Sequence, residues 1–126
     1  MVRTAAWIRT NIPDDAVLVA PPWQHRFWIL AERALVATYK QPPINARNRE
    51  WLDRLVDLNG GVPFTGNGKR AMVELRANYP KLSREHLRVL RDRYGARYYV
   101  NEEARPDLGW PLVYSNAVYH IYEIGD

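Results

Sequence analysis

The spacing of hydrophobic and polar positions along the chain predicts which segments are strands. Residues 16–20, Ala-Val-Leu-Val-Ala, form a continuous apolar run between Asp14-Asp15 and Pro21-Pro22. Such a run is typical of a strand that is buried on both faces of a sheet. Two further apolar segments, 34–39 and 96–100, predict the second and third strands.

Between the second and third strands the apolar positions take a helical spacing. From Asn45 to Asn59 they recur every three or four residues, and Gly60-Gly61 ends the pattern. A second helix is predicted after Ser83, a favourable N-cap residue, and it ends at Gly95, where a left-handed C-terminal cap belongs. Shorter helices are expected at 3–11 and 70–78.

The last part of the chain predicts a hairpin. Residues 111–114 and 118–124 are rich in Val, Ile and Tyr and are joined by Ser115-Asn116-Ala117. The complete order is strand, short helix, strand, helices, strand, hairpin. It predicts an α/β fold: a Rossmann-like three-layer sandwich with a mainly parallel sheet of about five strands and a C-terminal antiparallel hairpin. With 126 residues, the chain is expected to form a single soluble domain over 1–126.

Composition narrows the class of protein. The chain is 47% hydrophobic and 25% charged, which is typical of a globular domain. No apolar run approaches the roughly 18 residues of a membrane-spanning helix, so we expect none in this sequence. Because there is no cysteine, disulfides, thiolate catalysis and cysteine-ligated zinc are excluded. The net charge of +4 comes from basic residues spread along the chain, so no nucleic-acid partner is expected.

A glycine-rich stretch at 61–70 invites comparison with a phosphate-binding loop. That loop needs a lysine directly after its second conserved glycine, followed by serine or threonine, and Asn67 and Arg70 break this pattern. The stretch also follows a helix, whereas a phosphate-binding loop lies between a strand and a helix N-terminus. We therefore interpret it as a surface turn and expect no nucleotide cofactor.

Histidine and serine residues give no catalytic or metal-binding pattern either. His25, His86 and His120 are far apart, and none belongs to a paired metal-binding motif. Ser83 and Ser115 are interpreted as a helix cap and a turn residue. The sequence therefore predicts no catalytic residue, no metal site and no cofactor.

The segment from Trp23 to Trp28 is the strongest candidate for a binding site. It follows the first predicted strand, and open α/β sheets bind ligands at the carboxyl ends of their strands. Four of its side chains could stack on a sugar or contact a partner, namely Trp23, His25, Arg26 and Trp28. The alternative is that the aromatic rings of this segment only cover the sheet.

The order of several segments resembles a known family. The segments are Trp7-Ile8-Arg9-Thr10-Asn11-Ile12-Pro13-Asp14-Asp15-Ala16, the single Trp23, Arg33-Ala34, and Tyr94-Gly95-Ala96-Arg97-Tyr98. They look like the soluble C-terminal domain of bacterial multi-pass C-type glycosyltransferase-like membrane proteins. Distant relatives of these include the oligosaccharyltransferase catalytic subunit, in which a Trp-Trp-Asp-Tyr-Gly motif helps to hold the acceptor peptide. Of that motif only Trp23 has a counterpart here.

This resemblance implies a location and a role. It implies a domain on the extracytoplasmic (periplasmic) side of a bacterial membrane, whose partner is the membrane-embedded part of the same polypeptide. In such families the catalytic carboxylates lie in the membrane part, so the isolated domain is expected to be non-catalytic and to shape a site for a glycan or peptide acceptor. The alternative is a stand-alone cytosolic Rossmann-like binding module or small enzyme.

Overall fold

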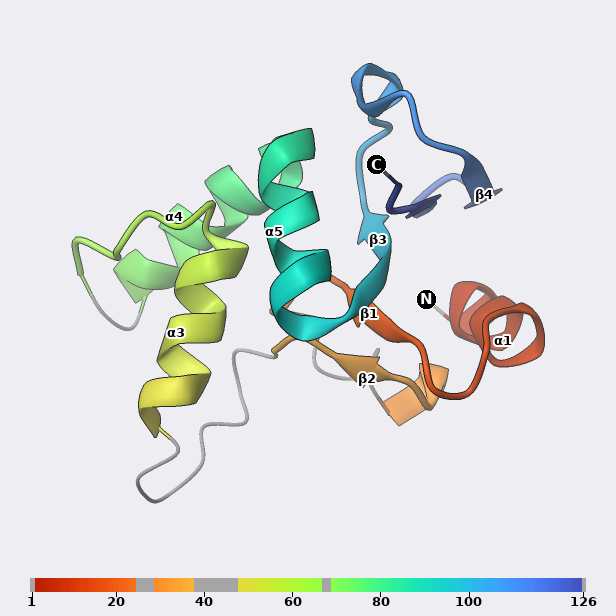
Figure 1. Cartoon of the computed structure of the whole chain (residues 1–126), viewed down its shortest axis with the longest axis horizontal. Coiled ribbons are helices and arrows are strands. Elements are labelled where there is room, and N and C mark those ends of the chain that lie inside the picture. Colours follow the sequence, from red (N-terminus) through yellow and green to blue (C-terminus); the bar gives the residue numbers. More distant parts are fainter. Residues whose placement is uncertain (1, 25–28, 38–47, 67–68, 126) are drawn as a thin grey trace.

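The computed structural model describes residues 2–24, 29–37, 48–66 and 69–125. Figure 1 shows the arrangement of its helices and strands. The helices are α1 (Val2–Asn11), α3 (Asn48–Leu58), α4 (Lys69–Asn78) and α5 (Arg84–Tyr94), with short 3₁₀ helices η1 (Tyr79–Lys81) and η2 (Pro106–Leu108). The strands are β1 (Val17–Val19), β2 (Ala34–Leu35), β3 (Ala96–Asn101), β4 (Leu112–Ser115) and β5 (His120–Glu123).

The sheet is mixed, so the prediction of a mainly parallel, Rossmann-like sandwich is wrong. Its five strands lie in the order β2-β1-β3-β5-β4. β1 pairs in parallel with β2 and with β3. β5 pairs antiparallel with both β3 and β4. The parallel part is therefore confined to β3 and the two short strands on one side of it.

The connection after β3 explains this difference. Parallel neighbours need a crossover of a dozen or more residues, usually through a helix. Only the 3₁₀ helix η2 lies between β3 and β4, and β4 then turns directly into β5. The returning strand β5 therefore pairs antiparallel with β3, and β4 becomes the edge. The sequence pattern located these strands, but it did not show which of them lies beside β3.

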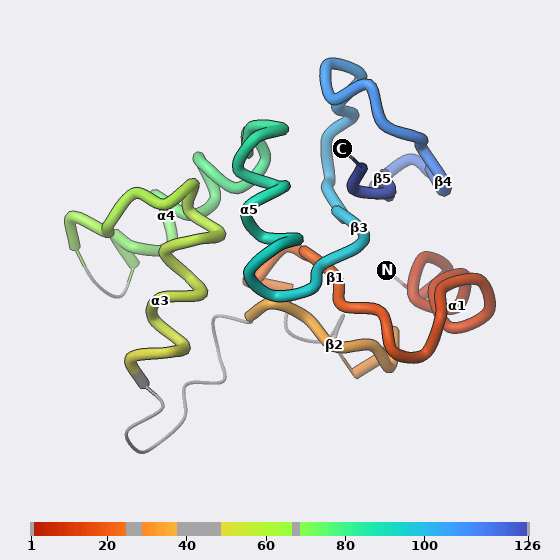
Figure 2. The backbone as a smooth tube through the Cα atoms, viewed as in Figure 1, coloured from red at the N-terminus to blue at the C-terminus, as the bar shows by residue number. Residues whose placement is uncertain are grey.

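Two groups of buried side chains lie on opposite faces of the sheet. Figures 1 and 2 show α3, α4 and α5 on one side of β3 and α1 on the other. Tyr99 belongs to the group under α3, α4 and α5, whereas its neighbours Tyr98 and Val100 belong to the group under α1. This alternation follows from the period of two in a strand, which sends successive side chains to opposite faces.

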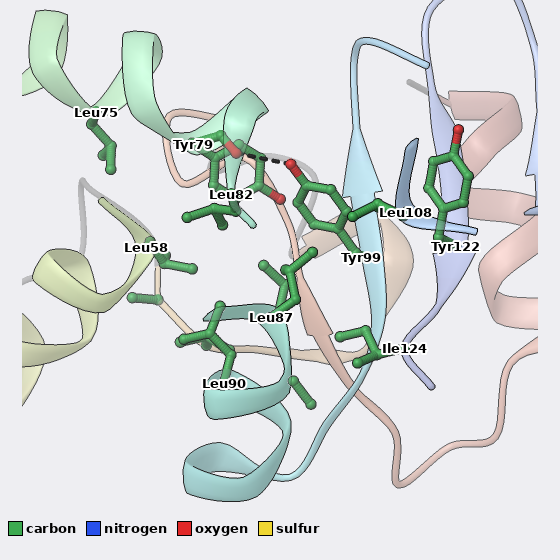
Figure 3. Close-up of a cluster of buried hydrophobic side chains, with 14 of the residues drawn as sticks. Leu58, Leu75, Tyr79, Leu82, Leu87, Leu90, Tyr99, Leu108, Tyr122 and Ile124 are labelled. Carbon is green, nitrogen blue, oxygen red and sulfur yellow. Dashed lines mark hydrogen bonds between the residues drawn. The ribbon is translucent and has the colours of Figure 1, made fainter. Parts of the chain in front are cut away.

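Tyr79 and Tyr99 form the most buried polar contact between the helices and the sheet (Figure 3). The Tyr79 hydroxyl donates to the Val100 carbonyl at 2.6 Å, and the Tyr99 hydroxyl donates to the Tyr79 carbonyl at 2.8 Å. Burial raises the pKa of both phenols well above the ordinary value, so both remain hydrogen-bond donors. The two bonds fix η1 on β3, because each links one segment to a carbonyl of the other.

The predicted caps of the helix after Ser83 are confirmed. The Ser83 hydroxyl accepts a hydrogen bond from the His86 N–H at 3.0 Å. Gly95 ends the helix in the left-handed conformation, with φ 72°, and its N–H donates to the Arg91 carbonyl. A residue with a side chain would be strained at this φ, so the glycine lets the chain pass directly from α5 into β3.

Arg33 closes the C-terminal end of α1. It is buried, and its guanidinium donates to the carbonyls of Ile12 at 2.7 Å and Arg9 at 3.0 Å. The last carbonyls of a helix have no partner within the helix, and a cation at that end also interacts favourably with the helix dipole. Arg33 therefore joins α1 to the start of β2, 21 to 24 residues further along the chain.

We expect Tyr79→Phe to destabilise the fold more than Tyr98→Phe. Removing the Tyr79 hydroxyl takes a donor from a buried carbonyl, which costs about 1–2 kcal/mol. Tyr98 is a matched control, because it is a buried tyrosine too. Its hydroxyl makes no hydrogen bond to the described residues. Urea unfolding of both variants measures the difference. Equal losses would show that the Tyr79 hydroxyl contributes nothing specific.

Replacing Arg33 tests the closure of α1. Arg33→Met keeps an unbranched side chain but leaves several helix carbonyls without donors, so we expect a loss of about 2–3 kcal/mol in the free energy of unfolding. Asp14, which pairs with Arg33 at 3.2 Å but is fully exposed, is the control. Asp14→Asn should be nearly neutral, because exposed ion pairs contribute little. If the two variants unfold at the same urea concentration, the hydrogen bonds from Arg33 to the helix carbonyls do not contribute measurably to stability.

Candidate binding site

The carboxyl ends of β1 and β3 form a topological switch point. β1 lies between two parallel neighbours, and the chain runs from β1 to β2 on one side and from β2 to β3 on the other. The first connection contributes Ala31 to the α1 face of the sheet, and the second passes over the opposite face through α3, α4 and α5. Open α/β sheets bind ligands where two such connections diverge.

Trp23 lies at this point and is bonded to the end of the neighbouring strand. The turn after β1 is closed by the Gln24 N–H, which donates to the Pro21 carbonyl at 3.0 Å. The Trp23 indole Nε1 donates to the Glu102 Oε1 at 3.1 Å. Glu102 directly follows β3, so this single hydrogen bond joins the carboxyl ends of β1 and β3.

Two further residues hold the Trp23 ring. The ring meets that of Tyr79 nearly at a right angle, with the interplanar angle at 84° and the centroids 5.5 Å apart. The Arg76 guanidinium carbon lies 5.3 Å from the Trp23 ring centroid, a cation–π contact. Trp23 is half-buried and is held by its N–H and its ring together. We call the group of Trp23, Arg76, Tyr79 and Glu102 the Trp23 corner.

Of the four side chains that the sequence nominated, the structure describes only Trp23. His25, Arg26 and Trp28 lie outside the described residues, as do Asn67 and Gly68 of the glycine-rich stretch. The sequence pattern did not point to the other three residues of the corner, namely Arg76, Tyr79 and Glu102. A usable signal existed for Glu102, since it follows a predicted strand in the same way as Trp23 does.

The remaining histidines make local contacts away from the Trp23 corner. His86 Nε2 contacts the Asp57 carbonyl, and His120 Nδ1 lies 3.2 Å from the Ser115 hydroxyl. His86 is partly buried, and this contact bridges α5 to α3. Within the described ranges, His, Asp and Glu side chains form no group of three or more that could hold a metal ion.

A second cluster of charged residues joins α3 to α5. Asp57 is buried, and its carboxylate accepts two hydrogen bonds from Arg93, at 2.9 and 2.8 Å, and a further bond from the Tyr94 hydroxyl. The Arg54 guanidinium carbon lies 4.7 Å from the centre of the Tyr94 ring. Because the donors satisfy the buried carboxylate, the cluster fixes the two helices relative to each other.

The comparisons with known proteins give one match. Residues 1–58 match a family model described as a domain of unknown function (DUF6798). The matched region runs from α1 to the end of α3, so it includes Trp23 and Arg33 but neither Arg76 nor Glu102. No curated protein and no solved structure matches the chain. In the part of the chain that the structure describes, no helix has the length and apolar character needed to cross a membrane.

The Asp57 cluster predicts a loss of stability at alkaline pH. Burial, followed by the hydrogen bond to the Asp57 carboxylate, raises the pKa of Tyr94 from 10.0 to about 12. The raised pKa contributes stability that is complete below pH 10 and is lost as the pH rises to about 12, because only the unfolded chain then ionises this phenol. Urea midpoints measured across this window should fall less for Tyr94→Phe than for the unmodified protein. Parallel curves would contradict the assignment.

Proposed function

We propose that this chain is a non-catalytic, extracytoplasmic domain of a glycosyltransferase-like integral membrane protein. In this proposal the Trp23 corner helps to shape the site for a glycan or peptide acceptor. The membrane-embedded portion of the same polypeptide is its partner and carries the catalytic groups. The segment order around Trp7, Trp23, Arg33 and Tyr94 supports the family assignment.

The observation that carries the binding role is the Trp23–Glu102 hydrogen bond at the switch point. It places an aromatic ring and a carboxylate at the edge where sheets of this kind bind ligands. Glu102 is exposed, and a carboxylate accepts several hydrogen bonds, so the bond to Trp23 leaves acceptor capacity for hydroxyl or amide donors. Arg76, also exposed, brings guanidinium donors to the same ring.

This chemistry suits a neutral, hydroxyl-rich or amide-rich ligand. Sugar rings and peptide groups present both donors and apolar C–H surface, and aromatic side chains combine a large apolar surface with one polar group. The corner brings together one indole, one carboxylate and one guanidinium from three separate segments. The binding of a ligand that contacts all three groups would depend on how β1, α4 and β3 are placed relative to one another.

The proposal predicts a specific response of the Trp23 indole. Titrating the protein with chitotriose or with an Asn-Ala-Thr peptide should shift the Trp23 indole N–H resonance saturably at millimolar ligand, because a ligand that bonds to the same carboxylate changes the surroundings of this N–H. Glu102→Ala should weaken binding about threefold to tenfold, as expected for the net loss of one hydrogen bond. The resonance is assigned by its disappearance in Trp23→Phe.

Trp7 provides the internal control for this titration. It packs against Tyr114, with ring centroids 4.9 Å apart, on the α1 face of the sheet. Its indole resonance should not move, so a shift shared by Trp7 and Trp23 would indicate a general solvent effect. If the Trp23 resonance stays in place with both ligands, the corner is a structural contact and the proposed binding role is wrong.

A further inference from the structure

A groove lies between α3 and α4, away from the Trp23 corner. It has a volume of about 370 Å³, within the range of small-molecule pockets. Its floor and walls are formed by the core-facing side of α3, the loop after α3 and the start of α4, namely by Trp51, Leu52, Leu55, Val56, Pro63, Phe64, Gly66 and Ala71. Every residue of this lining is apolar.

The lining is partly built into the core and partly open to solvent. Trp51 and Phe64 are half-buried and pack against the core group under the helices. Leu52 keeps 46% of its surface exposed, although it lies one turn before the buried Leu55. The two small residues Gly66 and Ala71 leave the space between the helices unfilled. An apolar body that entered the groove would remove Leu52 and its neighbours from water.

Two arginines border this apolar surface. Arg49 lies one helical turn before Leu52, so both belong to the same face of α3. The side chain of Arg70 runs along Gly66, where an added Cβ would come within 2.3 Å of its Cδ atom. Both arginines are exposed, and neither forms an ion pair with any residue in the described ranges.

Two acidic residues close in sequence to these arginines, Glu50 and Glu74, already have partners, whereas Asp53 forms no ion pair with a described residue. Glu50 pairs with Arg54 at 3.1 Å. The Glu74 carboxylate accepts from the Thr65 hydroxyl at 2.9 Å and from the Thr65 N–H at 3.2 Å. Arg49, one helical turn before Leu52, and Arg70, next to Ala71, therefore carry guanidinium groups beside the lining of the groove. Guanidinium groups bind carboxylate and phosphate through paired hydrogen bonds.

We infer that the groove binds a single amphiphile with an apolar chain and an anionic head group. The chain lies against Trp51, Leu52 and Phe64, and the head group binds to Arg49 and Arg70. This inference goes beyond the proposed acceptor site and uses none of the residues of the Trp23 corner. The two proposals can therefore fail separately.

The test compares head groups on one chain length. Decanoate, decanol and decyltrimethylammonium are titrated into the full chain below their micelle-forming concentrations, and binding is followed by calorimetry. Decanoate should bind about tenfold more tightly than decanol, because charge-assisted hydrogen bonds form only with the carboxylate. The cationic amphiphile should bind most weakly. The double variant Arg49→Glu, Arg70→Glu should abolish the preference for decanoate.

Leu52→Asp and Val73→Asp locate the site. Leu52→Asp puts a carboxylate into the apolar lining and should weaken decanoate binding at least about tenfold. Val73 is the matched control, because it is 67% exposed on α4 and does not line the groove. Its variant should bind as the unmodified protein does. Both changes are at exposed positions, so both variants are expected to fold.

Three results would overturn the inference. One is decanoate binding that Leu52→Asp leaves unchanged, and another is equal affinity for decanoate and decanol. The third is binding to vesicles of phosphatidylglycerol without binding to decanoate, which would make this face a contact surface for a bilayer. Saturable decanoate binding that is lost in Leu52→Asp and kept in Val73→Asp supports the groove as the site, whatever the Trp23 titration shows.

Discussion

The rest of the structure depends on the position of β3. This strand pairs with a neighbouring strand along each edge and packs against buried side chains on each face. It pairs in parallel with β1 and antiparallel with β5, and five of its six residues are buried. A shift of one residue would exchange Tyr98 and Tyr99 between the two faces. Tyr99 would then lose the Tyr79 carbonyl, and η1 would lose a buried polar link to the sheet. The register of β3 is therefore fixed by packing and by buried hydrogen bonds together.

The candidate site follows from the same register. Leu18 pairs with Tyr98 and Val19 with Tyr99, so β1 and β3 end next to each other. The residues after them, Trp23 and Glu102, are 79 positions apart in the chain and meet only because the two strands are neighbours. Tyr79 joins this corner to the core, since its ring contacts Trp23 and its hydroxyl bonds to β3. A substitution that displaces Tyr79 or Tyr99 would therefore also change the position of Trp23.

Arginine serves three different purposes in this chain. Arg33 bonds to helix carbonyls, and Arg105 bonds to the carbonyls of Pro80 and Leu82, so both connect segments that are distant in sequence. Arg93 satisfies the buried carboxylate of Asp57. Arg49 and Arg70 remain at the rim of the apolar groove, where they are available to a ligand. Some of the basic residues therefore connect parts of the fold, whereas Arg76, Arg49 and Arg70 belong to the two proposed ligand sites.

Local interactions allowed the sequence alone to determine several elements. The Ser83 and Gly95 caps bounded α5, helical spacing identified α3, and short apolar runs located the strands, because each signal acts within a few positions. The first residues of the predicted helix, 45–47, lie outside the described residues. Tertiary structure decided the rest. The antiparallel pairing of β5 with β3 depends on which edge of β3 remained free, and the approach of Arg76 and Glu102 to Trp23 depends on that sheet order. No local pattern encodes either feature, since both arise from contacts between segments that are far apart in the chain.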